Sequence, residues 1–135
     1  MLVSLPEITA LLQGVQTIAV VGLSPKENRP SNDVARYLIA AGFTVIPVNP
    51  GQTEILGAKC YPSLTEIPVP VDLVNIFRRS EDVGPVVDEA IAIHAKAVWM
   101  QQGIANETAA AKAKAAGLKV IMDRCIKVDH ANLFN

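Results

Sequence analysis

The feature that most constrains this chain is an apolar run, Ile18 to Val21, that stops at Gly22 and is followed by a polar, basic loop and a helix start. A short apolar run bounded by a turn signal is typical of a strand buried on both faces. In α/β proteins the loop after such a strand lies at the carboxyl edge of the sheet, where ligands usually bind. Residues 22–31 are therefore the first candidates for a binding site.

The rest of the chain repeats this alternation of apolar runs and helical patterns. We expect strands at 17–21, 43–48, 71–77, 97–101 and 118–122, helices capped by Ser4, by Ser31 or Asn32, by Ser80 and by Asn106, and a long connection at 52–70. Strands alternating with helices predict one α/β domain over residues 1–135, with a three-layer, Rossmann-like, doubly wound parallel sheet of five strands. The expected strand order is 3-2-1-4-5. Residues 1–14 should form an N-terminal helix, and residues 123–135 a tail with little pattern.

Composition excludes several classes of partner. The net charge is −1 and 19% of the residues are charged, which gives no electrostatic basis for binding nucleic acid or an anionic membrane. No apolar run approaches the roughly 18 residues of a membrane helix, and no basic residue precedes Lys26, as a signal peptide would require. The two cysteines, Cys60 and Cys125, have neither a disulfide framework nor metal-ligand spacing. We expect a cytoplasmic protein without a metal site.

The loop that begins at Gly22 does not fit the common nucleotide motifs. Its sequence, GLSPKE, lacks the second and third glycines of the dinucleotide fingerprint, and the second strand ends in Asn49-Pro50 instead of an acidic residue. No GK[ST] is present either. Still, Gly22 permits close approach of a ligand, Ser24 offers a hydroxyl, and Lys26 and Arg29 add charge near a helix N-terminus. These residues favour a phosphate ligand over a merely solvated surface loop.

Six short motifs occur in order along the chain: VVGLS at 20–24, RPS at 29–31, VIPVNP at 45–50, IFRRS at 76–80, VWMQQG at 98–103 and MDRC at 122–125. Their order and spacing resemble the CoA-binding domain family, which includes the N-terminal domain of the succinyl-CoA synthetase α subunit. The resemblance covers about residues 15–129 and is most specific for small, stand-alone CoA-binding proteins. The sequence departs from the family pattern at Asn32-Asp33, where an aromatic-glycine pair is more usual, and at Ile126, where proline is expected.

The resemblance implies a Rossmann-type sheet that binds coenzyme A or an acyl-CoA across the carboxyl ends of its strands. The implied contacts are Gly22, Leu23, Ser24, Lys26, Arg29, Pro30 and Ser31 for the phosphates, Val48, Asn49 and Pro50 for the adenosine, Phe77 and Arg78 on the far side, and Gln101, Gln102 and Gly103 beside the pantetheine arm. Arg124 and Cys125 follow the last strand and would lie at the mouth of the same cleft. Cys125 is either a buried filler or a thiol that an adjacent arginine makes reactive toward the CoA thiol.

These observations leave three functional hypotheses. The first is a non-catalytic CoA carrier, sensor or subunit, because no pair of carboxylates is placed for acid–base chemistry and no catalytic residue is assigned. The alternative is a nucleotide-dependent enzyme, a reductase or ligase fragment, that uses the same cleft. The third is a regulatory module that binds a protein through Trp99 or the C-terminal tail, with a homodimer or another protein as partner. We interpret His94 and His130 as structural residues.

Overall fold

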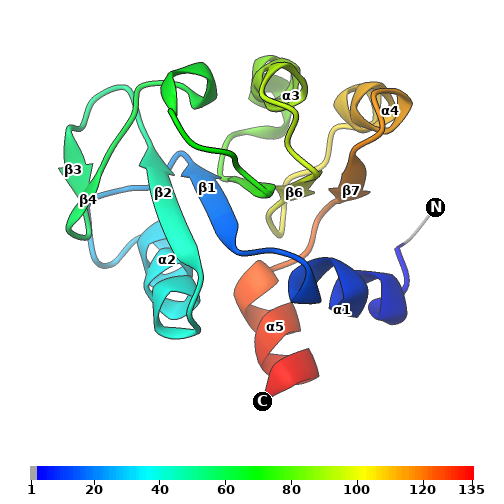
Figure 1. Cartoon of the computed structure of the whole chain (residues 1–135), viewed down its shortest axis with the longest axis horizontal. Coiled ribbons are helices and arrows are strands. Elements are labelled where there is room, and N and C mark those ends of the chain that lie inside the picture. The colour runs from blue at the N-terminus through cyan, green and yellow to red at the C-terminus, as the bar shows by residue number, and fades with distance from the viewer. Residues whose placement is uncertain (1–2) are drawn as a thin grey trace.

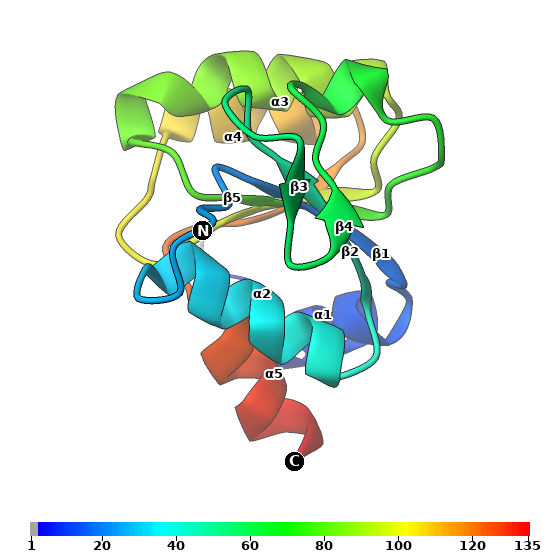
Figure 2. The same ribbon diagram turned by 90° about the vertical axis from the view of Figure 1, so that its left-hand side faces the viewer.

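The computed structural model describes residues 3–135 and has three layers (Figures 1 and 2). The middle layer is a parallel sheet of five strands: β1 (Thr17–Val21), β2 (Thr44–Val48), β5 (Leu73–Ile76), β6 (Ala97–Met100) and β7 (Lys119–Ile121). Helices α1 (Leu5–Gln13), α2 (Pro30–Ala40) and α5 (Ile126–Phe134) cover one face, and α3 (Val83–Ala92) and α4 (Glu107–Ala115) cover the other. The predicted α/β class, with a parallel five-stranded sheet, is confirmed.

The strand order differs from the expected one. The sheet runs β2-β1-β5-β6-β7, so the third sheet strand lies inside, next to β1, and not outside β2. One physical reason is Pro47, which has no amide hydrogen to donate to a further strand, so β2 is suited to the edge. The chain therefore crosses back over β1 after β2 and pairs β5 with β1, from Ile18 opposite Leu73 to Val21 opposite Ile76. Because the chain reverses its direction there, the carboxyl ends of β1 and β5 form the topological switch point of the sheet.

The long connection between β2 and β5 contains a hairpin that the sequence pattern did not reveal. Strands β3 (Glu54–Ile55) and β4 (Ala58–Lys59) pair antiparallel around Leu56 and Gly57, both of which have positive φ angles. A leucine at the first turn position gives no turn signal, unlike the usual asparagine or aspartate. Later in the same connection, the chain forms the 3-10 turn η1 (Leu64–Glu66).

Several predicted helix ends are confirmed and others are shifted. The Ser4 hydroxyl accepts the Glu7 amide at 3.3 Å in a capping box, and Asn106 caps α4 by accepting the Ala109 amide at 2.9 Å. Helix α2, however, begins at Pro30, ahead of both of its expected caps. Ser80 opens the 3-10 turn η2 (Ser80–Asp82), which precedes α3, and its hydroxyl accepts the Ala105 amide.

The C-terminal residues form a helix and not a patternless tail. Ile126 of α5 is fully buried, and His130 packs against the rings of Tyr37, Phe43 and Phe134. The Tyr37 hydroxyl lies 2.7 Å from Nδ1 of His130, and burial lowers the pKa of this imidazole. Such tertiary packing stabilises a nine-residue helix whose own sequence has weak periodicity.

Trp99 lies in the core and cannot form a surface for a partner. Its side chain is 0% exposed, and its indole Nε1 donates to the carbonyl oxygen of Arg124 at 2.8 Å. The burial of Trp99 fits its place in a buried strand, and the hypothesis that a protein partner binds through Trp99 is wrong, because the single chain already buries this side chain.

Candidate functional site

The candidate site is centred on Gly22, where the ends of three strands meet. The Gly22 amide donates to the Val48 carbonyl of β2 at 2.9 Å, and the Phe77 amide after β5 donates to the Val21 carbonyl at 2.8 Å. The φ angle of Gly22 is +85°, and a Cβ placed on it would overlap the Phe77 carbonyl oxygen. Gly22 is thus required both for its backbone conformation and for the close contact of β1 with β5 at the switch point.

The loop between β1 and α2 is held by its own polar groups. The Ser24 amide donates to Ser31 Oγ at 3.0 Å, and the Lys26 amide donates to Ser24 Oγ at 3.1 Å. Ser31 is only 5% exposed, so this predicted phosphate contact has its side chain inside the loop. Ser24 Oγ accepts the Lys26 amide and keeps its own hydrogen free to donate to a ligand.

The end of β2 supports the same loop. Nδ2 of Asn49 donates to the Leu23 carbonyl at 3.0 Å, and its Oδ1 accepts the Gly51 amide at 2.8 Å. Leu23 and Val48 are buried, whereas Pro50 is exposed at the surface. Asn49, which was predicted to contact the adenosine, therefore also joins β2 to the loop after β1.

Three basic side chains at this edge have no acidic partner. Within residues 3–135 no carboxylate oxygen lies within 4.0 Å of the side-chain nitrogens of Lys26, Arg29 or Arg78. Nη1 of Arg78 lies 3.2 Å from the position that a Cβ on Gly22 would take, so its guanidinium covers this glycine. Arg79 is different, because Asp82 and Glu81 lie 3.0 and 3.6 Å from its Nε.

The N-terminus of α2 adds a further positive end to the site. Arg29 is the N-cap residue, it makes no side-chain cap, and Pro30 is the first residue of the helix. Pro30 has no amide hydrogen, and the amides of Asn32 and Asp33 both donate to the Arg29 carbonyl at 3.1 Å, so the contribution of this end is the helix dipole, which favours an anion there. The eleven-residue helix α2 therefore reinforces the charge of Lys26 and Arg29.

Gln101, at the end of β6, is buried and connects β5 to the start of α5 by hydrogen bonds. It is 6% exposed, and its Oε1 accepts Nδ2 of Asn75 at 3.2 Å and the Ile126 amide at 3.4 Å. Because both partners are donors, they fix the orientation of the Gln101 amide. Oδ1 of Asn75 is buried and has no hydrogen-bond partner within the described residues. Sequence reasoning placed Gln101 correctly at a strand end but missed its contacts, which come from distant parts of the chain.

Asp123 joins the loops after β6 and β7, and it was not among the predicted site residues. Its Oδ1 accepts the amide of Gly103 at 2.6 Å, and its own φ angle is +59°. Asp and Asn adopt this left-handed conformation more readily than most residues, so an aspartate directly after a strand is the signal that could have found it. Gln102, by contrast, is exposed.

Arg124 is not available as a free cation. Its Nε and Nη2 donate to the two carboxylate oxygens of Asp129 at 2.7 and 2.9 Å, and this pairing raises the pKa of the guanidinium. Cys125, the N-cap residue of α5, is partly exposed and lines a shallow hollow that includes Gln102. Cys60 is buried and its Sγ lies 3.5 Å from the Asn49 carbonyl; burial raises the pKa of its thiol. Of the two thiols, Cys125 is the accessible one.

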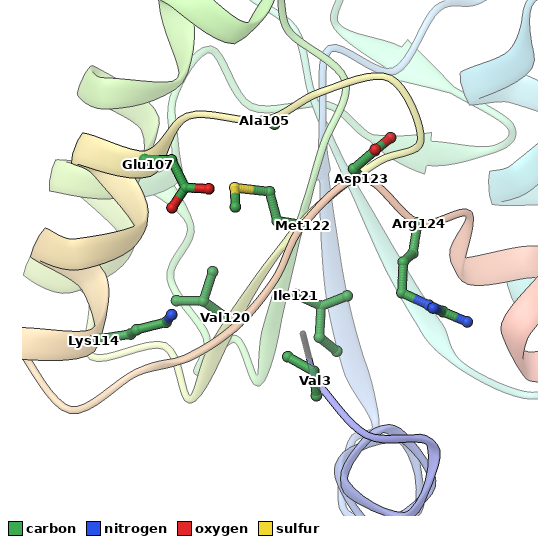
Figure 3. A pocket seen from close by; sticks show the side chains of 9 residues that line it. All are labelled: Val3, Ala105, Glu107, Lys114, Val120, Ile121, Met122, Asp123 and Arg124. Atoms are coloured by element: carbon green, nitrogen blue, oxygen red, sulfur yellow. The ribbon is translucent and has the colours of Figure 1, made fainter. Parts of the chain in front are cut away.

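A separate cavity of about 290 Å³ lies at the β7 edge of the sheet (Figure 3). In this view Glu107 and Lys114 reach from α4 toward Val120 and Met122, while the Arg124 side chain points away from the cavity. Its lining residues are Val3, Ala105, Glu107, Lys114, Val120, Ile121, Met122, Asp123 and Arg124. Only Arg124 among them is a predicted site residue, so the cavity does not mark the switch point.

In the part of the chain from residue 3 onward, no three His, Cys, Asp or Glu side chains are grouped so as to hold a metal ion. None of the helices among these residues has the length and apolar character needed to cross a bilayer.

Comparison with known proteins assigns the family. Residues 16–131 match the family described as "CoA binding domain". The chain belongs to this CoA-binding domain family. It is 48% identical over 125 residues to the "Uncharacterized protein YneT" of Bacillus subtilis, with 93% of each chain covered. A "hypothetical protein from Pyrococcus horikoshii OT3" superimposes with a TM-score of 0.96 and 38% identity, covering 98% of this chain and 94% of that one.

Longer proteins match only part of this chain. The chain is 40% identical over 74 residues to "Acetate--CoA ligase [ADP-forming] I" of Archaeoglobus fulgidus. That match spans 55% of this chain and only 11% of the ligase. The similarity thus concerns one domain of a longer enzyme.

Proposed function

We propose that this protein binds coenzyme A or an acyl-CoA at the carboxyl edge of its sheet, as a non-catalytic carrier, sensor or subunit. The observation that carries the proposal is the arrangement at the switch point. There Gly22 lets the end of β1 pack closely against the Phe77 carbonyl after β5, and Arg78, Lys26 and Arg29 have no acidic partner within residues 3–135. Membership in the CoA-binding domain family supports the identity of the ligand.

The chemistry of CoA fits this distribution of charge. CoA carries a diphosphate and a separate 3′-phosphate, so it needs several cations and amide donors spread over a surface. In the proposed arrangement the diphosphate lies at the N-terminus of α2, near Ser24 and Lys26. The adenosine lies against residues 48–50. The pantetheine arm extends past Phe77 toward residues 101–103.

Two predicted contacts take other roles in this proposal. Arg124 is neutralised by Asp129, so it orders the start of α5 and does not hold a phosphate. The Ser31 side chain supports Ser24 from inside the loop. Cys125 remains at the rim of the site, where the CoA thiol could reach it.

Ligand-dependent thermal stability tests this function. The protein is melted with CoA, dephospho-CoA, NAD and ATP, each at the same concentration. A ligand at about 100 times its dissociation constant adds roughly 2.7 kcal/mol to the free energy of unfolding. We expect the largest stabilisation with CoA and a smaller one with dephospho-CoA, which lacks one phosphate. A larger shift with NAD or ATP than with CoA would refute the proposal and favour the nucleotide-dependent enzyme.

A further inference from the structure

Asn32 supports the loop between β1 and α2 from its inner side. Asn32 is 2% exposed. Its Nδ2 donates to the Ser24 carbonyl at 2.9 Å, and its Oδ1 accepts Nε of Arg36 at 2.9 Å. Both ends of this buried amide are therefore engaged, and its orientation is fixed by a donor on one side and an acceptor on the other.

Arg36 holds the same loop at a second point. Its Nη2 donates to the Glu27 carbonyl at 3.1 Å, so one guanidinium fixes Glu27 directly and Ser24 through Asn32. The shortest separation between Arg36 and a carboxylate is 3.9 Å, to Asp33, which is longer than its two hydrogen bonds. Arg36 thus acts on the loop by hydrogen bonding more than by ion pairing.

Arg36 differs in this respect from the other basic residues nearby. Lys26 and Arg29 are exposed on the loop without acidic partners within residues 3–135, which suits groups that touch a phosphate. Two of the five N–H donors of Arg36 are used within the protein, on the carbonyl of Glu27 and on Oδ1 of Asn32. Removal of Arg36 does not leave Asp33 unpaired, because Nζ of Lys127 lies 2.8 Å from its carboxylate.

We propose that Arg36, acting through Asn32, is a positioning residue that holds residues 24–27 in the conformation that receives the diphosphate. This inference rests on the proposed CoA-binding function. A pre-ordered loop gives tighter binding because the ligand does not have to order it. Loss of the brace therefore lowers affinity without removing any group that touches the ligand.

The test compares variants by CoA affinity and by stability without ligand. Arg36→Met removes both hydrogen bonds, Asn32→Ala cuts the link to Ser24, and Arg36→Lys keeps a donor that reaches only one acceptor. Arg79→Met is the matched control, since Arg79 pairs with Asp82 and Glu81 outside the loop. Dissociation constants are measured by isothermal titration calorimetry well below the melting temperatures, and amide hydrogen exchange of Ser24 and Lys26 is followed without ligand.

We expect Arg36→Met to weaken CoA binding about tenfold, and Arg36→Lys to give an intermediate value. The double variant, Arg36→Met with Asn32→Ala, should lose less affinity than the product of the two single losses, because both changes interrupt the connection from Arg36 through Asn32 to Ser24. Exchange at Ser24 and Lys26 should rise in Arg36→Met, while Arg79→Met stays within about twofold of wild type in affinity. If Arg36→Met does not fold, Asn32→Ala is compared with the wild type instead, by the same measurements of CoA affinity and amide exchange.

The two proposals fail in distinguishable ways. If the wild type binds CoA and Arg36→Met binds it equally well, the positioning role is wrong and the proposed function stands. Additive losses in the double variant would also overturn the role, because they would mean independent contacts. If the wild type binds no CoA, both proposals fall.

Discussion

At the amino edge of the sheet the charge of Asp72 is paired, whereas at the carboxyl edge a paired cation, Arg124, occurs together with cations that have no acidic partner within residues 3–135. At the amino edge, Oδ2 of Asp72 accepts the amides of Gln16 and Thr17, each at 2.9 Å, and the Lys96 ammonium lies 3.3 Å from Oδ1. At the carboxyl edge, Lys26 and Arg78 have no carboxylate within 4.0 Å in the described part of the chain. The charge of Asp72 is thus balanced within the protein, whereas the positive charges of Lys26 and Arg78 are not balanced by a carboxylate within residues 3–135.

The largest effect is expected from Gly22→Ala at the carboxyl edge. The new Cβ would collide with the Phe77 carbonyl, and a residue other than glycine is strained at a φ of +85°. Left-handed strain of about 1–2 kcal/mol and overpacking of about 1–3 kcal/mol together predict a loss of about 3 kcal/mol in the free energy of unfolding. Urea denaturation measures this loss, and calorimetry with CoA should show weaker binding because the switch point is displaced.

Gly42→Ala provides the matched control near the amino edge. Gly42 also has a positive φ, +102°, but among residues 3–135 no atom beyond Gly42 and its two chain neighbours lies within 4 Å of a Cβ placed there. Only the backbone strain of about 1–2 kcal/mol applies, and CoA affinity should not change. If Gly22→Ala and Gly42→Ala lost the same free energy of unfolding, the close contact between β1 and β5 at Gly22 would contribute nothing to stability. The two edges would then not differ in this respect.

The sequence predicted the features that depend on local patterns. The apolar run ending at Gly22, the Ser4 capping box and the Asn106 cap are local signals, and the structure contains all three. The strand order is not local, because a buried parallel strand has the same composition whether it lies next to β1 or beyond β2. Pro47 was the available clue to an edge position, and it argued against placing another strand there.

Within the candidate site, the sequence could locate residues at strand ends but not their hydrogen-bond partners. Gln101 is tied to Asn75 and Ile126, which lie 26 and 25 residues away along the chain. Arg124 pairs with Asp129 only because residues 126–134 form a helix, and its weak periodicity concealed that helix. Contacts of this kind arise from tertiary packing, so the free cations could not be separated from the paired ones by spacing alone.

A smaller effect, on binding and not on stability, is expected from Arg78→Met. Because Arg78 has no acidic partner within residues 3–135, removal of its charge should change the melting temperature little. Loss of one charge-assisted hydrogen bond to phosphate should weaken CoA binding about tenfold. The CoA affinity of the wild type should also fall as the salt concentration rises. The affinity of Arg78→Met should fall less steeply, because this variant has one fewer charge at the site.

The control for this comparison is Arg79→Met. Its guanidinium is exposed and paired with carboxylates, and exposed pairs contribute 0–1 kcal/mol. We expect unchanged CoA affinity and nearly unchanged stability. A loss of affinity in Arg79→Met equal to that in Arg78→Met would show that the paired and unpaired arginines do not differ in function.

The smallest effect is expected from Asp72→Asn at the amino edge, and it should fall on stability alone. Burial raises the pKa of the Asp72 carboxyl, but the amides of Thr17 and Gln16 and the Lys96 ammonium outweigh it and leave the pKa below its usual value. An asparagine oxygen still accepts a hydrogen bond but loses the charge, so about 1 kcal/mol of stability should be lost at pH 7. CoA affinity should stay within about twofold of wild type.

The pH dependence of the stability lost in Asp72→Asn tests whether the charge of Asp72 is the cause of that loss. A carboxyl whose folded pKa is depressed contributes stability that is complete above its unfolded pKa, near 3.9, and that is lost as the pH falls through the folded pKa. The difference in stability between wild type and Asp72→Asn should therefore be constant from pH 7 to about pH 5 and shrink below about pH 4, as urea titrations at each pH would measure. Asp88→Asn, at an exposed residue paired with Lys112, should show a much smaller difference at every pH. A difference for Asp72 that persists unchanged to pH 3, or a tenfold loss of CoA affinity, would contradict the assignment of this edge to stability and of the opposite edge to binding.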